Sequence, residues 1–502
     1  MGILKSSTCE GGLKGHGGRR AGILLPLSAL PSVNGIGNLG QAAYDFVDFL
    51  SEAGQTYWQI LPIGPTGYGD SPYQCFSAFA GNPKLIDRTS GCHCGPDPTC
   101  AGRAPARTSE STAYESENVT ASVVKQSTAY EKFCSEQGAW LNDFALFMAV
   151  KEKNGGLPLL EWSIEDINPT PARFKKLRQE LQEKIELHRQ DQFLFFTQWR
   201  NLKAYANVKH ISIIGDLPFY IASDSSEFWM RRNLFEVSDN GLPSEVAGVP
   251  PDLFSETGQV WNNPAYNEKA RKVVKAWWIE RLAQAAQLYD TVRIDHFRGF
   301  SEYYTIPVGK NGKAKAATSG SWKQGLGMEL IDEIHERLPG TSIIAEDLGL
   351  LGAEAKALVK QSGFPGMKVL QFAFDSDSSN EYLPHNCDEN SIAYTGTHDN
   401  NTLKGWLDEA TEAELSFAMD YFGINSKSKL PDTLLRAALA SRSSVVIVPL
   451  VDWLGLGAKA RFNTPGTVGG TNWKWQAKSS QLNSALAEKI RHYTRTLYNR
   501  TD

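Results

Sequence analysis

The sequence predicts an α/β fold, namely a (β/α)8 TIM barrel with inserted helical subdomains. Short apolar runs rich in β-branched residues recur along its 502 residues and stop at Gly, Pro or Asp. These runs are continuous rather than alternating, which is typical of parallel strands that are buried on both faces. Helical patterns separate several runs, since apolar residues recur at three and four positions in segments 176–206 and 273–290. A doubly wound open sheet is the alternative fold.

Eight runs are candidate strands, the number that a barrel of this kind needs. In chain order they are AGILL (21–25), YWQILP (57–62), SIIGDL (212–217), TVRID (291–295), SIIAE (342–346), KVLQFAF (368–374), SIAYTGT (391–397) and VVIVPL (445–450). About 150 residues separate the second run from the third, far more than one crossover helix requires. We therefore expect an inserted subdomain at about residues 84–205.

The predicted barrel domain spans residues 21–475. An N-terminal extension (1–20) precedes it, and a C-terminal helix (476–502) follows it. The sequence has no internal repeat. A chain of this length with 41% apolar residues can bury a large core, so one decorated domain is expected.

The composition argues against two classes of partner. Lys and Arg number 51 against 56 Asp and Glu, and no basic run is present that would neutralise phosphates or hold an anionic membrane. No stretch approaches the roughly 20 apolar residues that span a bilayer, and the first 20 residues lack the apolar core of a secretory signal. We expect no nucleic acid or membrane partner and an intracellular location, in the cytoplasm or the plastid stroma.

The seven cysteines are an odd number spread over a large chain, which favours reduced thiols over a disulfide framework. One cluster is a possible zinc site and comprises Cys92, His93, Cys94 and Cys100. Its spacing fits no common structural zinc site, so ordinary loop thiols are the preferred interpretation and no metal is expected. The 13 Trp, 17 Tyr and 23 Phe fill cores, and their flat rings can also stack on sugars.

Acidic residues close several of the predicted strands. In a barrel, chemistry takes place at the carboxyl ends of the strands. Four runs end there in Asp216, Asp295, Glu346 and the pair His398 and Asp399. A single Asp at a strand end is more often a turn former or a helix cap. Four strands that end in carboxylates indicate an active site.

Strand alternation assigns different surroundings to two of these carboxylates. Arg293 and Asp295 share a face, and a nearby Arg is expected to hold the pKa of Asp295 below its usual value, although a structural ion pair would have the same pattern. Glu346 shares its face with Ile344 and Leu348, an apolar setting that favours the protonated carboxyl. One charged and one protonated carboxyl are what glycoside cleavage requires, and a separation of about 5–5.5 Å would make the reaction retaining.

At these strand ends the sequence closely resembles the α-amylase clan and, within it, the amylomaltases of glycoside hydrolase family 77. The resemblance extends from about Gly22 to Trp475. Its most specific segments are WQILPIGPTGYGDSPYQ (58–74), SAFAGNP (77–83), VAGVPPDLFSETGQVWNNP (246–264), PGMKVLQFAF (365–374) and NTPGT (463–467). The sequence departs from the family pattern in residues 88–127 and in GGTNWKWQ (469–476), where an Arg commonly follows the second Trp.

The resemblance implies a 4-α-glucanotransferase that needs no cofactor. Such an enzyme cleaves α-1,4-glucans with retention through a covalent glucosyl-enzyme and transfers the segment to the 4-hydroxyl of another glucan or of glucose. Its substrates are starch-derived glucans, maltooligosaccharides and glucose. By the resemblance, Asp295 is the nucleophile, Glu346 the general acid/base and Asp399 the third carboxylate, which holds sugar hydroxyls. The sequence does not indicate an oligomeric state.

The resemblance also implies a set of substrate-binding residues. They are Tyr73, Asp216, Arg293, His398, Trp261, Phe254, Asp70, Ser71, Asn463 and Pro465. Segment 246–264 is expected to be a loop over the cleft that brings Trp261 and Phe254 near the sugars. Tyr68 matches a secondary glucan site of some relatives, with a packing role as the alternative.

Two other functions use the same features. An α-glucan hydrolase would have the same three carboxylates. A catalytically inactive glucan-binding protein is expected to have lost at least one of them, but all three are present.

Overall fold

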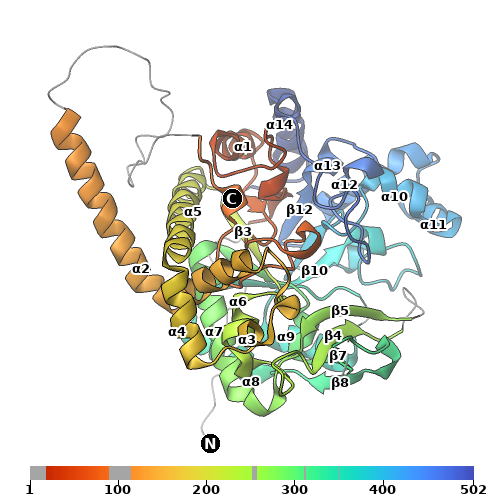
Figure 1. Cartoon of the computed structure of the whole chain (residues 1–502). Coiled ribbons are helices and arrows are strands. Elements are labelled where there is room, and N and C mark those ends of the chain that lie inside the picture. Colours follow the sequence, from red (N-terminus) through yellow and green to blue (C-terminus); the bar gives the residue numbers. More distant parts are fainter. Residues whose placement is uncertain (1–17, 90–114, 252–256, 310–311, 350, 502) are drawn as a thin grey trace, which may run out of the picture.

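The computed structural model describes residues 18–89, 115–251, 257–309, 312–349 and 351–501, with the main chain alone at 115–127 (Figure 1). Its central element is an eight-stranded sheet in the order β10-β11-β12-β1-β2-β3-β6-β9, and every pairing in it is parallel. The strands are β1 (Arg20–Leu24), β2 (Tyr57–Gln59), β3 (Ser212–Leu217), β6 (Thr291–Ile294), β9 (Ser342–Ala345), β10 (Gly366–Val369), β11 (Ser391–Tyr394) and β12 (Val445–Pro449). The predicted (β/α)8 barrel is confirmed.

The sheet closes on itself between β9 and β10. The N–H of Ala345 donates to the carbonyl of Pro365 at 2.9 Å. The carboxylate of Asp347 accepts from the N–H of Met367 at 2.7 Å. Gly366 leaves room for that carboxylate, because a Cβ there would lie 2.4 Å from Asp347 Oδ2. Asp347 therefore joins the two strands at the point of closure.

Each predicted apolar run overlaps a barrel strand, but the run 368–374 extends beyond the end of its strand. The predicted strand 368–374 is extended only as far as Val369 and then turns into a 3-10 segment, Leu370–Phe372. The side chain of Gln371 donates to the carbonyl of Asn401 at 2.8 Å in this turn. The sequence of this turn is as apolar as that of a buried strand, and Leu370 and Gln371 are buried, so the apolar pattern alone does not reveal where the strand ends.

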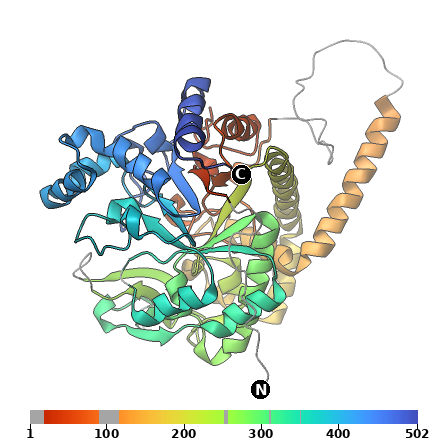
Figure 2. The ribbon, with the colours of Figure 1, turned by 180° about the vertical axis from the view of Figure 1, so that it is seen from behind.

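Helices cover the outside of the barrel (Figures 1 and 2). Those that follow or precede barrel strands are α1 (Gln41–Glu52), α7 (Arg271–Leu288), α8 (Met328–Arg337), α9 (Ala353–Ser362), α10 (Leu403–Glu409), α11 (Glu412–Phe422), α12 (Leu430–Ala440) and α13 (Leu450–Trp453). Near the C-terminus, α14 (Ser484–Arg491) leads into a π-helical turn, His492–Leu497. The Arg500 side chain then donates to main-chain carbonyls around Leu439 and Ser443, which fixes the C-terminal segment against the barrel.

Between β2 and β3, the described residues from Glu115 onward are mainly helical. They form α2 (Glu115–Lys153), α3 (Ile164–Ile167), α4 (Pro171–Glu180) and α5 (Gln182–Val208). Rings on α2 and α5 hold the two long helices together, with Phe133 at 5.7 Å from Phe196 and Trp140 at 5.6 Å from the same ring. Another short helix, α6 (Ser226–Met230), follows β3.

A second sheet was not predicted. It is antiparallel, has the order β5-β4-β7-β8, and consists of β4 (Glu245–Val249), β5 (Gln259–Pro264), β7 (Glu302–Pro307) and β8 (Ser321–Gln324). Segment 246–264 was expected to be a loop, but its described ends form the strands β4 and β5 of a hairpin, so that expectation was wrong for these residues. Its strands have few of the apolar runs used for prediction, and the pairing of β4 with β7 joins residues far apart in the sequence.

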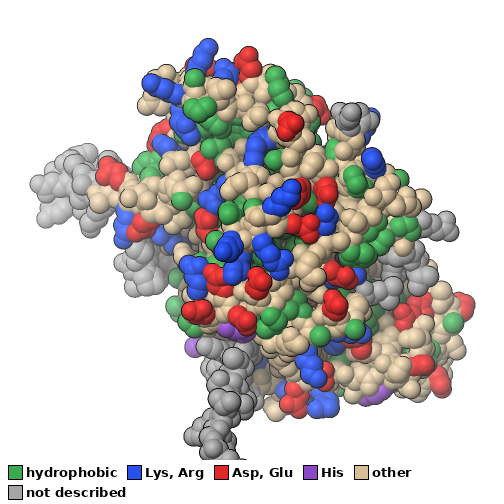
Figure 3. All heavy atoms as spheres, turned by 90° about the horizontal axis from the view of Figure 1, so that it is seen from below, with side chains coloured by type: hydrophobic (Ala, Val, Ile, Leu, Met, Phe, Trp, Pro, Cys, Tyr) green, Lys and Arg blue, Asp and Glu red, His purple; other side chains and the backbone are tan. Residues whose placement is uncertain are grey.

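Charged side chains of both signs are interspersed on the face in Figure 3, which accords with the small net charge. Among the described helices, none is long and apolar enough to cross a membrane.

Candidate active site

Three neighbouring strands bring the predicted acidic residues together. The register pairs Asp216 of β3 with Arg293 of β6. At the ends of β6 and β9, the N–H of Asp295 donates to Leu217 O and the N–H of Glu346 donates to Ile294 O, each at 3.0 Å. Adjacent strands lie about 4.7–4.9 Å apart, so Asp295 and Glu346 occupy neighbouring positions at the carboxyl end of the barrel.

A buried arginine connects two of these carboxylates. Arg293 Nη1 donates to both oxygens of Asp216, at 2.7 and 2.8 Å, and to Asp295 Oδ1 at 3.0 Å. The shared face of Arg293 and Asp295 was predicted, whereas the second partner, Asp216, was not. Burial lowers the pKa of Arg293, but the two carboxylates outweigh it and raise that pKa well above its ordinary value.

The protonation of Asp295 differs from the sequence-based expectation. Burial raises the pKa of Asp295 to about 7, the carboxylates of Asp216 and Glu346 add to that effect, and Arg293 opposes it. The side chain is still 28% exposed, so it stays open to a ligand although protein surrounds it. The expectation of a lowered pKa was wrong because Arg293 is shared with Asp216 and cannot offset burial alone.

Glu346 has polar surroundings rather than the apolar ones expected. Its Oε2 accepts from the N–H of His296 at 2.6 Å, and its Oε1 accepts from the N–H of Leu348 at 2.8 Å. Strand alternation identifies side chains on a face, but it does not identify main-chain donors from the turns that follow β6 and β9.

The end of β11 supplies a fourth carboxylate. Asp399 Oδ2 lies 3.4 Å from His398 Nε2, and Asp399 Oδ1 accepts from Asn463 Nδ2 at 2.6 Å. Burial raises the pKa of Asp399, but His398 and Asn463 together lower it to about 2. The side chain is 46% exposed, so an ionised carboxylate faces the solvent-accessible space.

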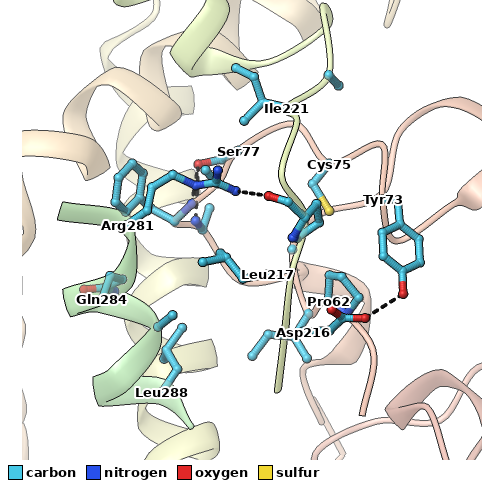
Figure 4. Close-up of a pocket in the computed structure, with 18 of the residues that line it drawn as sticks. Pro62, Tyr73, Cys75, Ser77, Asp216, Leu217, Ile221, Arg281, Gln284 and Leu288 are labelled. Carbon is cyan, nitrogen blue, oxygen red and sulfur yellow. Dashed lines mark hydrogen bonds between the residues drawn. The ribbon is translucent and has the colours of Figure 1, made fainter. Parts of the chain in front are cut away.

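Tyr73 connects the β3 and β11 sides of the site. Its hydroxyl donates to Asp216 Oδ2 at 2.6 Å (Figure 4). Its ring stacks on His398 with centroids 5.1 Å apart and an angle of 17° between the planes. Its N–H donates to Ser71 Oγ at 3.3 Å, which orders the turn that carries the tyrosine.

The pocket in Figure 4 lies beside this cluster, and Tyr73 and Asp216 line one part of it. Arg281 of α7 reaches into the same region and donates to the carbonyls of Pro218 at 2.7 Å and Phe219 at 3.3 Å. These bonds fix the chain where it leaves β3, directly after Asp216.

The β4–β5 hairpin reaches the site through Trp261. The Trp261 ring lies edge-on to that of His296, with centroids 5.4 Å apart. Asn263 Nδ2 donates to Ile221 O at 2.7 Å, which ties β5 to the segment after β3. The hairpin is thus anchored beside the turn that follows Asp295.

Three predicted binding residues are exposed on the surface, and a fourth lies outside the described residues. Asp70 pairs with Lys84 at 3.0 Å on the surface, Tyr68 is 73% exposed, and Pro465 is exposed. Phe254 lies outside the described residues. Binding roles for these residues stay predictions.

The structure also identifies neighbours that the sequence analysis missed. Arg461 donates to the carbonyls of Asp399 and Asn463, each at 2.6 Å, and so holds the two residues together. Trp473 has a φ of 63°, and its ring lies 6.2 Å from that of Tyr73. The motifs NTPGT (463–467) and GGTNWKWQ (469–476) indicated that residues 463–476 matter, but nothing in the sequence distinguished Arg461 from other basic residues.

No described group of three or more His, Cys, Asp or Glu side chains is placed to hold a metal ion. The cluster weighed as a zinc site, Cys92, His93, Cys94 and Cys100, lies outside the described residues.

A parallel barrel with carboxylates at the carboxyl ends of adjacent strands, around a buried arginine, is an arrangement suited to glycoside cleavage. The model of glycoside hydrolase family 77, described as 4-alpha-glucanotransferase, matches residues 25–482. The chain belongs to this family.

Known proteins are similar over nearly the whole chain. A 4-alpha-glucanotransferase of Streptococcus pneumoniae is 42% identical over 498 residues, which cover 96% of this chain and 97% of that protein. The chloroplastic/amyloplastic 4-alpha-glucanotransferase DPE1 of Arabidopsis thaliana is 37% identical and covers 92% of this chain and 82% of its own length. Among solved structures, an amylomaltase from Streptococcus agalactiae in complex with acarbose has a TM-score of 0.84 at 38% identity, with 96% of this chain and 100% of that chain covered.

Proposed function

We propose that this 4-α-glucanotransferase uses Asp295 as its nucleophile and Glu346 as its general acid/base. Asp295 attacks the anomeric carbon while Glu346 donates a proton to the departing glycosidic oxygen, so that a covalent glucosyl-enzyme forms. Glu346, now ionised, removes the proton from the 4-hydroxyl of a second glucan, whose oxygen displaces Asp295 and restores the α-linkage. Two inversions give net retention.

The observation that carries this assignment is the placement of two carboxylates on adjacent strands with different partners. Arg293 contacts Asp295, and main-chain N–H groups contact Glu346. The guanidinium stabilises negative charge on the nucleophile, whereas the N–H groups stabilise Glu346 after it has given up its proton. Asp399, held ionised by His398 and Asn463, is suited to accept hydrogen bonds from sugar hydroxyls.

Disproportionation of maltotriose tests the activity. Transfer yields glucose and a series of longer oligosaccharides while the total number of reducing ends stays constant. An α-glucan hydrolase, the rival function, releases one new reducing end for each bond cleaved. A rise in reducing ends that matches the bonds cleaved would refute the proposal, and the Asp295→Asn variant serves as the inactive control.

We infer that the substrates are α-1,4-glucans, maltooligosaccharides and glucose, and that the enzyme works inside the cell, in the cytoplasm or the plastid stroma. Cys75, Cys134 and Cys387 are free thiols, which fits a reducing compartment. The similarity to both a bacterial and a plastid-type relative supports these two locations equally. Fractionation of source cells with an antibody to the chain distinguishes them.

Trp261→Ala is expected to lower the ratio of transfer to hydrolysis by roughly threefold to tenfold. A stacking contact is worth about 0.5–1.5 kcal/mol beyond its buried area, and loss of that contact weakens acceptor binding while water keeps its access. Product and reducing ends are measured at several acceptor concentrations. Trp322→Ala is the matched control, since Trp322 lies in the same sheet on β8 and is 42% exposed. An unchanged ratio in well-folded Trp261→Ala would remove this residue from the acceptor site.

Asp216→Asn is expected to move the acid limb of kcat/KM to lower pH by about one unit. Asp295 must be ionised to attack, so kcat/KM falls as the pH drops through the pKa of Asp295. The substitution removes a like charge and leaves Arg293 with Asp295 as its charged partner, and both changes lower that pKa. The pH profile is compared with that of Asp377→Asn, a change on the surface. An acid limb that stays in place or moves upward contradicts this account.

A further inference from the structure

His296, the residue after Asp295, has an unusual main-chain conformation. Its φ of 53° and ψ of 47° place it in the left-handed region, directly before the 3-10 turn Phe297–Phe300. Among residues other than Gly, only Asn, Asp and His are enriched there, and β-branched residues are rare because the Cβ approaches the following carbonyl. Such strain persists only where the surrounding structure fixes it, and it concentrates at functional sites.

This conformation directs two consecutive N–H groups toward one residue. The N–H of His296 donates to Glu346 Oε2 at 2.6 Å, and the N–H of Phe297 donates to the carbonyl of Glu346 at 3.1 Å. In an extended strand, successive N–H groups point to opposite sides. A left-handed residue beside a helical turn instead makes consecutive N–H groups converge, as they do in anion-binding main-chain nests. Continued strand geometry at His296 would therefore turn the N–H of Phe297 away from Glu346, and the two N–H groups would no longer converge on that residue.

The imidazole ring holds the turn in place. Its centroid lies 5.4 Å from that of Trp261, 5.8 Å from Tyr220 and 5.9 Å from Phe219. Burial lowers the pKa of His296 to about 4, and Arg298 acts in the same direction. The ring is therefore neutral near pH 7 and packs among aromatic rings without burying a charge.

We propose that His296 is a positioning residue that sets the orientation of the Glu346 carboxyl through its left-handed main chain. The ring packs between the β4–β5 hairpin and the segment after β3 and so anchors this conformation. The N–H groups of His296 and Phe297 then hold Glu346 by hydrogen bonds. The inference rests on the proposed acid/base role of Glu346. It predicts that replacements at position 296 are ranked by their tolerance of the left-handed region rather than by their resemblance to histidine.

Two variants and two donors test the proposal. His296→Asn removes the imidazole but keeps a residue that accepts left-handed geometry, whereas His296→Val introduces a β-branched residue that does not. The donors are maltotriose, whose leaving group needs a proton, and α-maltosyl fluoride, whose fluoride leaves without one. For each variant, kcat and KM are measured on maltotriose, and the rate of the first turnover of fluoride release is measured on the second donor.

His296→Val is expected to lower kcat on maltotriose by about 10- to 100-fold at similar KM, part of the 10²–10⁴-fold contribution of general acid catalysis. Its first fluoride turnover is expected to stay within about threefold of the parent. His296→Asn, which loses the ring but keeps a residue suited to the left-handed region, is expected to lower kcat on maltotriose by less than about tenfold and to leave its first fluoride turnover within about threefold. Equal losses on the two donors, or equal losses in the two variants, would overturn the proposal. If His296→Val does not fold, His296→Ala replaces it and the same donor ratio decides.

Glu346→Gln, measured in parallel, distinguishes two failures. Suppose that Glu346→Gln is slowed on maltotriose but keeps its rate of first fluoride release, while His296→Val is slowed equally on both donors. Only the role of His296 is then refuted. If Glu346→Gln is slowed equally on both donors, the acid/base assignment of Glu346 is refuted, and the role of His296 is refuted with it.

Discussion

Asp295→Asn is expected to lower the rate of glucan transfer by roughly 10³- to 10⁵-fold while the protein stays folded. The amide of Asn cannot form the covalent intermediate. Its carbonyl can still accept the hydrogen bond from Arg293, and the loss of a negative charge beside Asp216 and Glu346 relieves repulsion. Thermal unfolding is therefore expected to change little, and initial rates on maltotriose measure the loss.

The matched control is Asp290→Asn, which changes a carboxylate just before β6, at the opposite end of the same strand. The Asp290 side chain accepts from the N–H of Ile213 at 2.8 Å, so its role is in the structure of the barrel's amino end. Its substitution is expected to affect stability but to leave the rate within about threefold. Retention of more than about a tenth of the parental rate in Asp295→Asn would disprove the nucleophile assignment.

Glu346→Gln is expected to lower the rate on natural glucans by about 10²- to 10⁴-fold and to spare the first turnover of α-maltosyl fluoride. The glutamine cannot donate the proton that a sugar leaving group needs, whereas fluoride leaves without it. In a second step the variant cannot activate an acceptor hydroxyl, so the glycosyl-enzyme should accumulate after one rapid release of fluoride. Fluoride release followed on the millisecond to second scale measures both effects.

The Glu346→Gln substitution also changes the hydrogen bonds between this side chain and the main chain. Both carboxylate oxygens of Glu346 accept from N–H groups, so the NH₂ of glutamine must face one donor. We expect a loss of about 1–2 kcal/mol in the free energy of unfolding, measured by denaturant titration. Equal losses of rate on both donors would point to a role other than acid catalysis.

The carboxylates could be predicted from sequence because the signal is local. A continuous apolar run that ends in an acidic residue identifies both the strand and the position of the side chain at its end, as for Asp295 and Glu346. Alternation by two residues then placed Arg293 and Asp295 on one face, and the structure has them 3.0 Å apart. The resemblance to family 77 pointed to the same residues independently.

What the sequence did not predict depends on contacts between distant segments. The sharing of Arg293 with Asp216, which decides the protonation of Asp295, requires the pairing of β3 with β6. The convergence of the N–H groups of His296 and Phe297 on Glu346 depends on the left-handed conformation of His296, which the residue type alone does not fix. The antiparallel sheet that contains the β4–β5 hairpin was missed because β4 and β7 are far apart in sequence and β8 is not continuously apolar.

The arrangement of the site explains why its electrostatics cannot be inferred residue by residue. Arg293 contacts two carboxylates, and its field is divided between them. Burial raises the pKa of Asp399 as well, but the hydrogen bonds from His398 and Asn463 and the charge of His398 lower it to about 2. The pKa values of Asp295 and Asp399, both at strand ends of the same barrel, thus differ by several units because their partners differ.

Identification of the residue that carries the covalent sugar tests the central claim most directly. Glu346→Gln is mixed with α-maltosyl fluoride, quenched within one turnover, digested and analysed by mass spectrometry. The carbon–fluorine bond breaks, fluoride leaves, and a bond forms between the anomeric carbon and a carboxylate oxygen. We predict one maltosyl group per protein, on the peptide that contains Asp295, and none when Asp295 is also changed to Asn. A maltosyl group on any other peptide, or fluoride release with no labelled peptide, would contradict the account.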